Sequence, residues 1–322
     1  MKTILIVVLD GVMDSSLAIT VDTLRAVRHL APGARAARLR VLLASQRKTV
    51  KTGAGMRIDP DISFAEAGSG RIKPDWIIIP GLGLTSDEAI SKRFAQADAQ
   101  AALKLLRQAP PSTCIGASCS AVFLLAHSGL LDGRQATMTW WLAHLFRARH
   151  PEVKLDESRM LVRDGRMLTA GSAFAQLDLM LAVIADAVGN EAAGICARYL
   201  LIDERPSQAR YMALSHVQHV DPTVIAAERW IDAHLAEAIS VTGLADALGM
   251  SSKTLARRID AAMGLTPLKF VQRRRLMRAA HLIETTGLSI EAVAERVGYQ
   301  DGTALRKLIK REFGVTPGAM RD

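Results

Sequence analysis

The chain has 322 residues, of which 49% are hydrophobic and 23% are charged, and it carries a formal net charge of +9. This balance is typical of globular proteins and excludes a disordered or fibrous chain, while the length predicts about two domains of roughly 100–200 residues each. A basic sequence favours a nucleic-acid partner only if the charge is concentrated on one surface.

The first half of the chain alternates short apolar runs with amphipathic segments. The runs typical of buried strands are Ile4–Leu9, Arg40–Ala44, Trp76–Pro80 and Thr113–Ser118. Helical periodicity covers Ser15–His29 and Asp87–Gln108. This alternation predicts a parallel sheet with helices on both faces. The first apolar run is far shorter than the roughly 20 residues that cross a bilayer, and Asp10 follows it at once, so we expect neither a membrane span nor a signal peptide.

A β-hairpin is predicted further along the chain, where Asp164-Gly165 lies between the apolar runs Met160–Val162 and Met167–Thr169. Two more helices are expected after it, at Ala173–Val188 and Ala192–Leu201. Beyond them the sequence becomes polar and is interrupted by proline, and no strand pattern returns. The predicted domain organisation is therefore a first domain over residues 1–202, a linker over 203–221 and a helical domain over 222–322.

The helical part contains one pattern twice. The matching residues are Leu244 and Val293, Ala245 and Ala294, Gly249 and Gly298, Leu255 and Leu305, Gly264 and Gly314, and Thr266-Pro267 and Thr316-Pro317. The predicted helices are Thr242–Leu248 and Ser252–Met263 in the first copy, and Ile290–Val297 and Asp301–Phe313 in the second. A short helix, a glycine turn and a second helix form the helix-turn-helix design. Two unrelated helical hairpins are the alternative, which the joint recurrence of these residues disfavours.

The turns of both copies contain residues suited to their positions. Gly249 and Gly298 can adopt the positive φ that ends the first helix in a sharp turn. Ser251 or Ser252 can cap the second helix of the first copy, and Asp301 can cap that of the second.

Basic residues are concentrated in the second helices and in the helix that joins the copies, Pro267–Glu284. Asp260 is the only acid between Lys253 and Arg278. The residues that we predict to contact DNA are Ser252, Lys253, Thr254, Arg257, Arg258, Arg274, Arg278, Gln300, Thr303, Arg306, Lys307 and Lys310. A solvated basic face without a partner is the alternative.

Different roles are expected within this set. Arg257 and Arg306 are the best candidates for base contacts, because a guanidinium matches the edge of guanine. Arg274 and Arg278, four residues apart, share a helix face and are expected to contact phosphates. Arg273 is expected nearer the core, with its stem buried.

Residues 223–322 resemble the DNA-binding domain of AraC-type transcription regulators. The stretch GYQDGTALRKLIKREFGVTPGAMR, which begins at Gly298, resembles the signature of that family, with Tyr299 as the usual aromatic after the turn glycine. The resemblance implies an all-α domain with two helix-turn-helix units, promoter DNA as a partner and contact with RNA polymerase; we expect the first domain to dimerise, which makes the protein a homodimer. A basic protein that binds DNA without sequence preference is a further alternative.

Cys119 lies between a predicted strand and a predicted helix. A strained turn at this place presents a side chain at a helix N-terminus, where backbone dipoles favour a thiolate, as in a nucleophile elbow. A buried, inert thiol is the alternative. The other cysteines, Cys114 and Cys196, complete neither a disulfide framework nor a zinc spacing, so we expect reduced thiols and a cytoplasmic protein without a metal or cofactor.

The first two hundred residues resemble the class I glutamine-amidotransferase-like, PfpI-type domain in the version fused to AraC-type regulators. The resemblance rests on Pro80-Gly81-Leu82-Gly83 and on the stretches GASCSAVFLLAHSGLLDGRQATMTWW from Gly116 and DGRMLTAGSAFAQLDLMLAVI from Asp164. It implies a flavodoxin-like α/β sandwich with a parallel sheet and with the elbow at Cys119.

Three departures from that family's pattern bear on activity. Thr139 stands where a histidine is usual, Ser16 where many members have a glutamate, and Ala121 where a glycine follows the elbow. A cysteine without a base lacks general acid–base assistance worth roughly 10²–10⁴ in rate. His144 is the only nearby substitute for that base, and it is a poor one; His127, on the helix after the elbow, is placed too far away.

We therefore interpret the elbow region as a ligand-sensing pocket with no catalytic residues. The candidate pocket residues are Ser16, Gly81, Gly83, Cys119, Ser120, Thr139 and Trp140. The remaining histidines have no metal spacing and are expected at the surface: His29, His150, His216, His219, His234 and His281. The predicted function is a transcription regulator that responds to a small-molecule effector, and the alternative is a cysteine-dependent hydrolase or amidase with an accessory helical domain.

Overall fold

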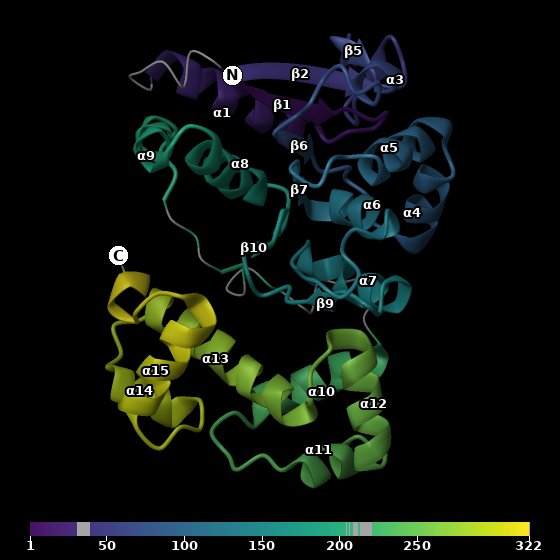
Figure 1. The fold of residues 1–322 in the computed structure, drawn as a ribbon. Coiled ribbons are helices and arrows are strands. Elements are labelled where there is room, and N and C mark those ends of the chain that lie inside the picture. Colours follow the sequence, from purple (N-terminus) through teal and green to yellow (C-terminus); the bar gives the residue numbers. More distant parts are fainter. Residues whose placement is uncertain (31–38, 204, 206, 209–211, 213–220, 322) are drawn as a thin grey trace. The chain divides into compact units, whose positions relative to one another are not determined.

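The computed structural model describes residues 1–30, 39–203, 205, 207, 208, 212 and 221–321. The chain divides into two compact units, Met1–Arg205 and Pro206–Asp322 (Figure 1). Most of the predicted linker, as well as His216 and His219, lies outside the described residues, so the predicted domain boundaries stay predictions. No helix in the described part of the chain is long and apolar enough to cross a membrane.

The first unit is built on a seven-stranded sheet with the order β10-β11-β7-β6-β1-β2-β5. Its strands are β1 (Lys2–Val7), β2 (Leu39–Ser45), β5 (Ile62–Ser63), β6 (Trp76–Ile79), β7 (Cys114–Ser118), β10 (Leu161–Asp164) and β11 (Met167–Ala170). All neighbours are parallel except β10 and β11, which form the predicted hairpin. Two short ribbons pair β3 (Val50–Lys51) with β4 (Arg57–Ile58) and β8 (Gln135–Ala136) with β9 (Lys154–Leu155).

Helices cover both faces of this sheet, so the predicted α/β sandwich is confirmed (Figure 1). Side chains alternate along a strand: Ile4 and Ile6 enter one core, and Leu5 and Val7 enter the other. The first core packs against α1 (Asp14–Leu30), α8 (Ala175–Ala187) and α9 (Asn190–Tyr199). On the other side lie α3 (Phe64–Ala67), α4 (Asp87–Phe94), α5 (Ala97–Arg107), α6 (Val122–His127) and α7 (Ala143–Arg149).

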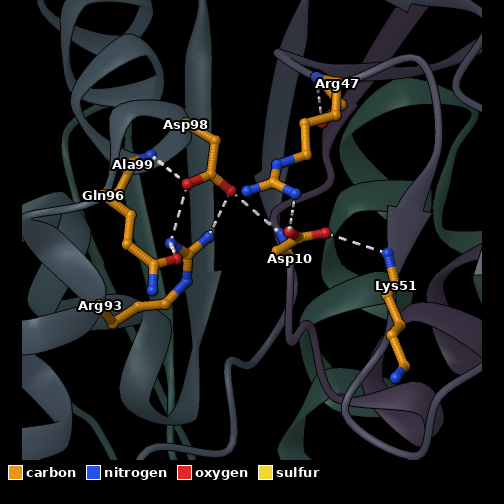
Figure 2. Close-up of polar contacts among 8 residues, drawn as sticks. Asp10, Arg47, Lys51, Arg93, Gln96, Asp98 and Ala99 are labelled. Carbon is orange, nitrogen blue, oxygen red and sulfur yellow. Dashed lines mark hydrogen bonds and ion pairs between the residues drawn. The ribbon is translucent and has the colours of Figure 1, made fainter.

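The prediction of one helix over Asp87–Gln108 is wrong. The chain forms α4 and α5 separately, and Gln96 between them has an extended backbone with φ −75° and ψ 147°. A buried bidentate ion pair spans this break, because Arg93 donates to the two carboxylate oxygens of Asp98 at 2.9 and 2.6 Å. Arg93 also donates to the Gln96 side chain at 2.7 Å (Figure 2).

Asp98 also ties this helix pair to the end of β1. The backbone N–H of Asp10 donates to Asp98 at 3.1 Å, and the Asp10 carboxylate accepts from the Lys51 N–H at 3.0 Å (Figure 2). Arg47, after β2, forms an ion pair with Asp10 at 2.8 Å. Burial alone would raise the pKa of Asp98, but the bonds and charge of Arg93, together with the backbone donors, lower it.

The second unit is helical in its described part. Its helices are α10 (Pro222–Ala233), α11 (Val241–Ala247), α12 (Ser252–Met263), α13 (Pro267–Thr285), α14 (Ile290–Arg296) and α15 (Gly302–Phe313). Ser251 and Asp301 cap α12 and α15, and the turn glycines Gly249 and Gly298 have φ of +66° and +76°, as predicted. Leu255, Ile259 and Met263 are buried, and so are Leu305, Ile309 and Phe313, so each second helix has one face in the core.

Candidate functional site

Cys119 occupies a strained turn at the carboxyl edge of the sheet. It follows β7 and begins a single 3₁₀ turn that leads into α6. Its φ of +53° is unusual for a residue with a side chain, and among the described non-glycine residues only Leu201 shares a positive φ. The Cys119 N–H donates to the Gly171 carbonyl at 2.8 Å, which holds the turn against the end of β11. The predicted elbow geometry is confirmed.

Three of the predicted pocket residues surround Cys119. Ser16 at the start of α1 accepts a 2.7 Å hydrogen bond from the Gly81 N–H. A Cβ atom added to Gly81 would lie 3.2 Å from the Cys119 Cβ and 3.4 Å from the Ser16 hydroxyl, so this glycine permits a close approach. The Thr139 side chain forms a hydrogen bond with Cys119, and its hydroxyl lies 3.4 Å from that of Ser172.

The other predicted pocket residues have different surroundings. The Ser120 hydroxyl accepts a 3.1 Å hydrogen bond from the Leu84 N–H, so it anchors the loop that follows β6. Gly83 lies exposed in that loop with φ +62°. Trp140 is half-buried, and its ring packs edge to face on Trp141 at 5.5 Å. Among the described residues the thiol forms hydrogen bonds with Ser120 and Thr139 and with neither Gly83 nor Trp140, so the place of these two in a pocket stays a prediction.

Burial raises the pKa of the Cys119 thiol, against the opposing effect of its hydrogen bonds with Ser120 and Thr139. The side chain is 2% exposed. The expectation that the helix N-terminus lowers this pKa is therefore wrong in sign, because removal from water outweighs the backbone dipoles of one short turn.

A slow reaction with iodoacetamide at pH 7.5 is the expected result for Cys119 in the native protein. Burial raises the pKa of this thiol, so a smaller fraction of it is ionised at that pH than in the unfolded chain, and the thiolate is the reactive form. Peptide mass spectrometry over time, with Cys119→Ser to assign the signal and urea-unfolded protein as the reference, measures the rate. A native rate equal to the unfolded rate would contradict the buried thiol.

The histidines nearest in sequence have other surroundings. His127, at the end of α6, has its ring centre 5.9 Å from that of Phe94 and 6.2 Å from that of His150. His150 is half-buried, and burial, reinforced by the charge of His127, lowers its pKa to about 4, so the expectation of a surface residue is wrong here. His144 acts electrostatically on Asp87. Among the described residues no group of His, Cys, Asp and Glu could hold a metal.

The predicted DNA-contacting residues of the two second helices lie on their outer faces. Those that are exposed are Lys253, Arg257, Arg258, Thr303, Arg306, Lys307 and Lys310. Gln300 is exposed in the second turn, and Ser252 and Thr254 are half-buried. Arg306 donates to Glu291 on α14 at 2.8 Å, and Arg258 donates to Thr223 at 2.6 Å. Each helix-turn-helix unit therefore presents a basic helix face. Arg258 also connects α12 to the start of α10.

The joining helix α13 differs from the prediction. Arg274 forms ion pairs with Glu228 and with Asp232 on α10, and its side chain is 15% exposed. Burial raises the pKa of Glu228, so withdrawing Arg274 would leave a buried acid without its counter-charge. The predicted phosphate contact of Arg274 is therefore corrected to a bond between helices. Arg273 is buried, as predicted, and Arg278 is exposed.

The family model that the first unit matches is the DJ-1/PfpI family, over residues 2–186, which is more than half of the chain. The chain belongs to the DJ-1/PfpI family. A second model, the helix-turn-helix domain, matches residues 244–322. The DJ-1/PfpI part and the helix-turn-helix part thus correspond to the two structural units, and the predicted family resemblances are confirmed.

Known proteins resemble this DJ-1/PfpI-family chain in both parts. The HTH-type transcriptional regulator GlxA of Rhizobium meliloti is 28% identical over 210 residues, which span 64% of each chain. The HTH-type transcriptional regulator GbdR of Pseudomonas aeruginosa is 25% identical over 315 residues, or 96% of this chain and 81% of that one. Drosophila melanogaster DJ-1beta shares the fold, with a TM-score of 0.51 and 21% identity over 63% of this chain and 99% of its own.

Proposed function

We propose that this chain is a sequence-specific, DNA-binding transcription regulator whose DJ-1/PfpI unit senses a small molecule. The observation that carries the proposal is the pair of helix-turn-helix units, each with a buried inner face and a basic outer face on its second helix. The alignment with GbdR, which runs through both units, supports the same combination of parts. Promoter DNA is the partner, so the chain acts in the cytoplasm.

We expect α12 and α15 to bind in two successive major grooves, at sites about 10 base pairs apart. Replacing Arg257 or Arg306 with alanine is expected to weaken binding to the preferred sequence by roughly 1–3 kcal/mol and to relax specificity at one or two base pairs, because a guanidinium donates two hydrogen bonds to guanine. Fluorescence anisotropy on DNA selected from a random pool, with a scrambled duplex at the same salt concentration, measures both effects. Unchanged footprints for both variants would refute the assignment.

Sensing is assigned to the region around Cys119. The elbow places a side chain at the carboxyl edge of the sheet, where α/β folds bind ligands. Its neighbours Ser16 and Thr139 are hydroxyl residues, which cannot act as a general base near neutral pH. We infer binding of an effector without turnover, and a homodimer that contacts RNA polymerase as the working form.

Cys119→Ser is expected to retain DNA binding without effector, because the helical unit has its own core. The same change is expected to impair the response to an effector, and the unmodified protein is expected to show no peptidase, amidase or glyoxalase-type activity. Anisotropy with the selected DNA and a panel of chromogenic amide and ester substrates measure these properties. Turnover that disappears in Cys119→Ser would establish the alternative, a cysteine-dependent hydrolase, which the strained elbow favours.

A further inference from the structure

Arg275, on the joining helix α13, contacts the loop that leads into the first helix-turn-helix unit and the turn of the second. Its guanidinium donates to the carbonyl of Glu237, in the loop before α11, at 2.5 Å. It also donates to the carbonyl of Gly298, in the turn of the second unit, at 3.2 Å. The two acceptors are backbone groups 61 positions apart in sequence. One side chain therefore connects the loop before the first helix-turn-helix unit to the turn of the second.

The Gly298 turn lies directly against the segment between α10 and α11, which leads into the first helix-turn-helix unit. A Cβ atom there would overlap the Leu235 carbonyl oxygen and lie 2.7 Å from Nη2 of Arg275. Gly249, the equivalent glycine of the first helix-turn-helix unit, has a similar positive φ, but nothing lies within 4 Å of an added Cβ. The duplicated glycines therefore differ. Both allow the turn, and of the two only Gly298 also permits a close contact with the segment that leads into the first helix-turn-helix unit.

The chemistry of arginine suits this position. A planar guanidinium donates in two fixed directions, and its hydrogen bonds are charge-assisted, so it holds two carbonyls at a set separation. A lysine ammonium lacks this rigid fork. The helix α13, whose 19 residues form a rod about 28 Å long, also connects the two helix-turn-helix units.

We propose that Arg275 is a positioning residue that holds the two helix-turn-helix units at one relative orientation and so makes the chain selective for the spacing between its two DNA subsites. This inference rests on the proposed function. It assigns Arg275 no contact with DNA, because both of its terminal nitrogens are directed at backbone carbonyls. Loss of the fork leaves α12 and α15 intact and lets their separation vary.

The test uses the full chain and DNA that the wild-type protein selects from a random pool. One base pair is then inserted between the two subsites, and affinities for the original and lengthened duplexes are compared at several salt concentrations. For the wild-type protein we expect a loss of at least about tenfold on insertion, because the second helix no longer meets its groove. For Arg275→Met we expect a loss of no more than about threefold, with an unchanged salt slope.

Arg278→Met is the matched control, because Arg278 lies on the same helix and is exposed. It is expected to weaken both duplexes equally, flatten the salt slope by about one and keep the spacing selectivity. If circular dichroism shows that Arg275→Met is unfolded, Arg275→Lys, which keeps the charge without the fork, is measured in its place and is expected to lose spacing selectivity.

Each result bears on a separate claim. A wild-type protein that enriches no sequence would refute the proposed function and the inference with it. Wild-type spacing selectivity that the Arg275 variant retains would overturn the inference alone. A salt slope that falls by about one in that variant would identify Arg275 as a phosphate contact and would also overturn it.

Discussion

Replacing Gly298 with asparagine is expected to lower the free energy of unfolding of the helical unit by about 3 kcal/mol, because the new side chain would overlap backbone and Arg275. The obstacle on one side is the Leu235 carbonyl, which cannot rotate away as a side-chain tip can. Asparagine tolerates the positive φ better than most residues, so the loss reports the overlap rather than the turn conformation. Urea titration with hydrogen exchange of the α14 and α15 amides measures the stability of this unit separately.

Gly249→Asn is the matched control for that experiment. It has the same backbone requirement and open space around the added side chain, so we expect a loss of less than about 1 kcal/mol. Equal losses for the two variants would show that the turn conformation, and not the contact between the units, makes Gly298 necessary.

Asp98→Asn is expected to lower the free energy of unfolding of the first unit by about 3–5 kcal/mol, because it leaves the buried charge of Arg93 without its counter-charge. The side chains of this ion pair are only 2% and 8% exposed. Arg47→Met provides the control: the Arg47 side chain is 57% exposed in its pair with Asp10, so its loss should cost no more than about 1 kcal/mol. Hydrogen exchange of the α5 amides in urea reads the local effect, and equal losses in the two variants would contradict the buried pair.

The stability difference between wild type and Asp98→Asn is also expected to depend on pH. The pKa of Asp98 is lowered from its ordinary value of 3.8, so the ionised form is favoured by folding. Its contribution is fully present above pH 3.8 and is lost as the pH falls through the folded-state pKa. We expect a constant difference from pH 5 to 8 that narrows below 3.8. A difference that widens at acid pH would show that burial, rather than Arg93, dominates this carboxyl.

Periodicity predicted most elements of the sheet and both duplicated helix pairs, because apolar spacing records which face is buried. It failed at Ala95 and Gln96, where the helical pattern continues through a real break. The break depends on Arg93 and Asp98 meeting across it and on Asp98 accepting from the distant Asp10 N–H. A contact between residues 88 positions apart in the sequence does not appear in the periodic pattern of apolar residues.

In the candidate sites, too, some features were predicted from the sequence and others depended on contacts that the sequence does not reveal. Cys119, Ser16 and Thr139 were predicted together from the resemblance to the PfpI-type domain, in which Thr139 and Ser16 stand where a histidine and a glutamate are usual. The direction of the thiol pKa was not predictable, because it depends on how completely other segments cover the side chain. The role of Arg274 was also misjudged, because charge alone does not reveal that it meets two acids of α10.

The side chains that surround Cys119 are uncharged hydroxyl residues, whose protonation does not change near neutral pH. Its hydrogen-bonding neighbours Ser120 and Thr139 do not titrate, nor does the adjacent Ser16, and burial raises the pKa of the thiol itself. From pH 5 to 8 the three hydroxyl groups therefore keep one protonation state. If the proposed effector binds here, these hydroxyl groups offer it the same uncharged hydrogen-bonding partners across that pH range.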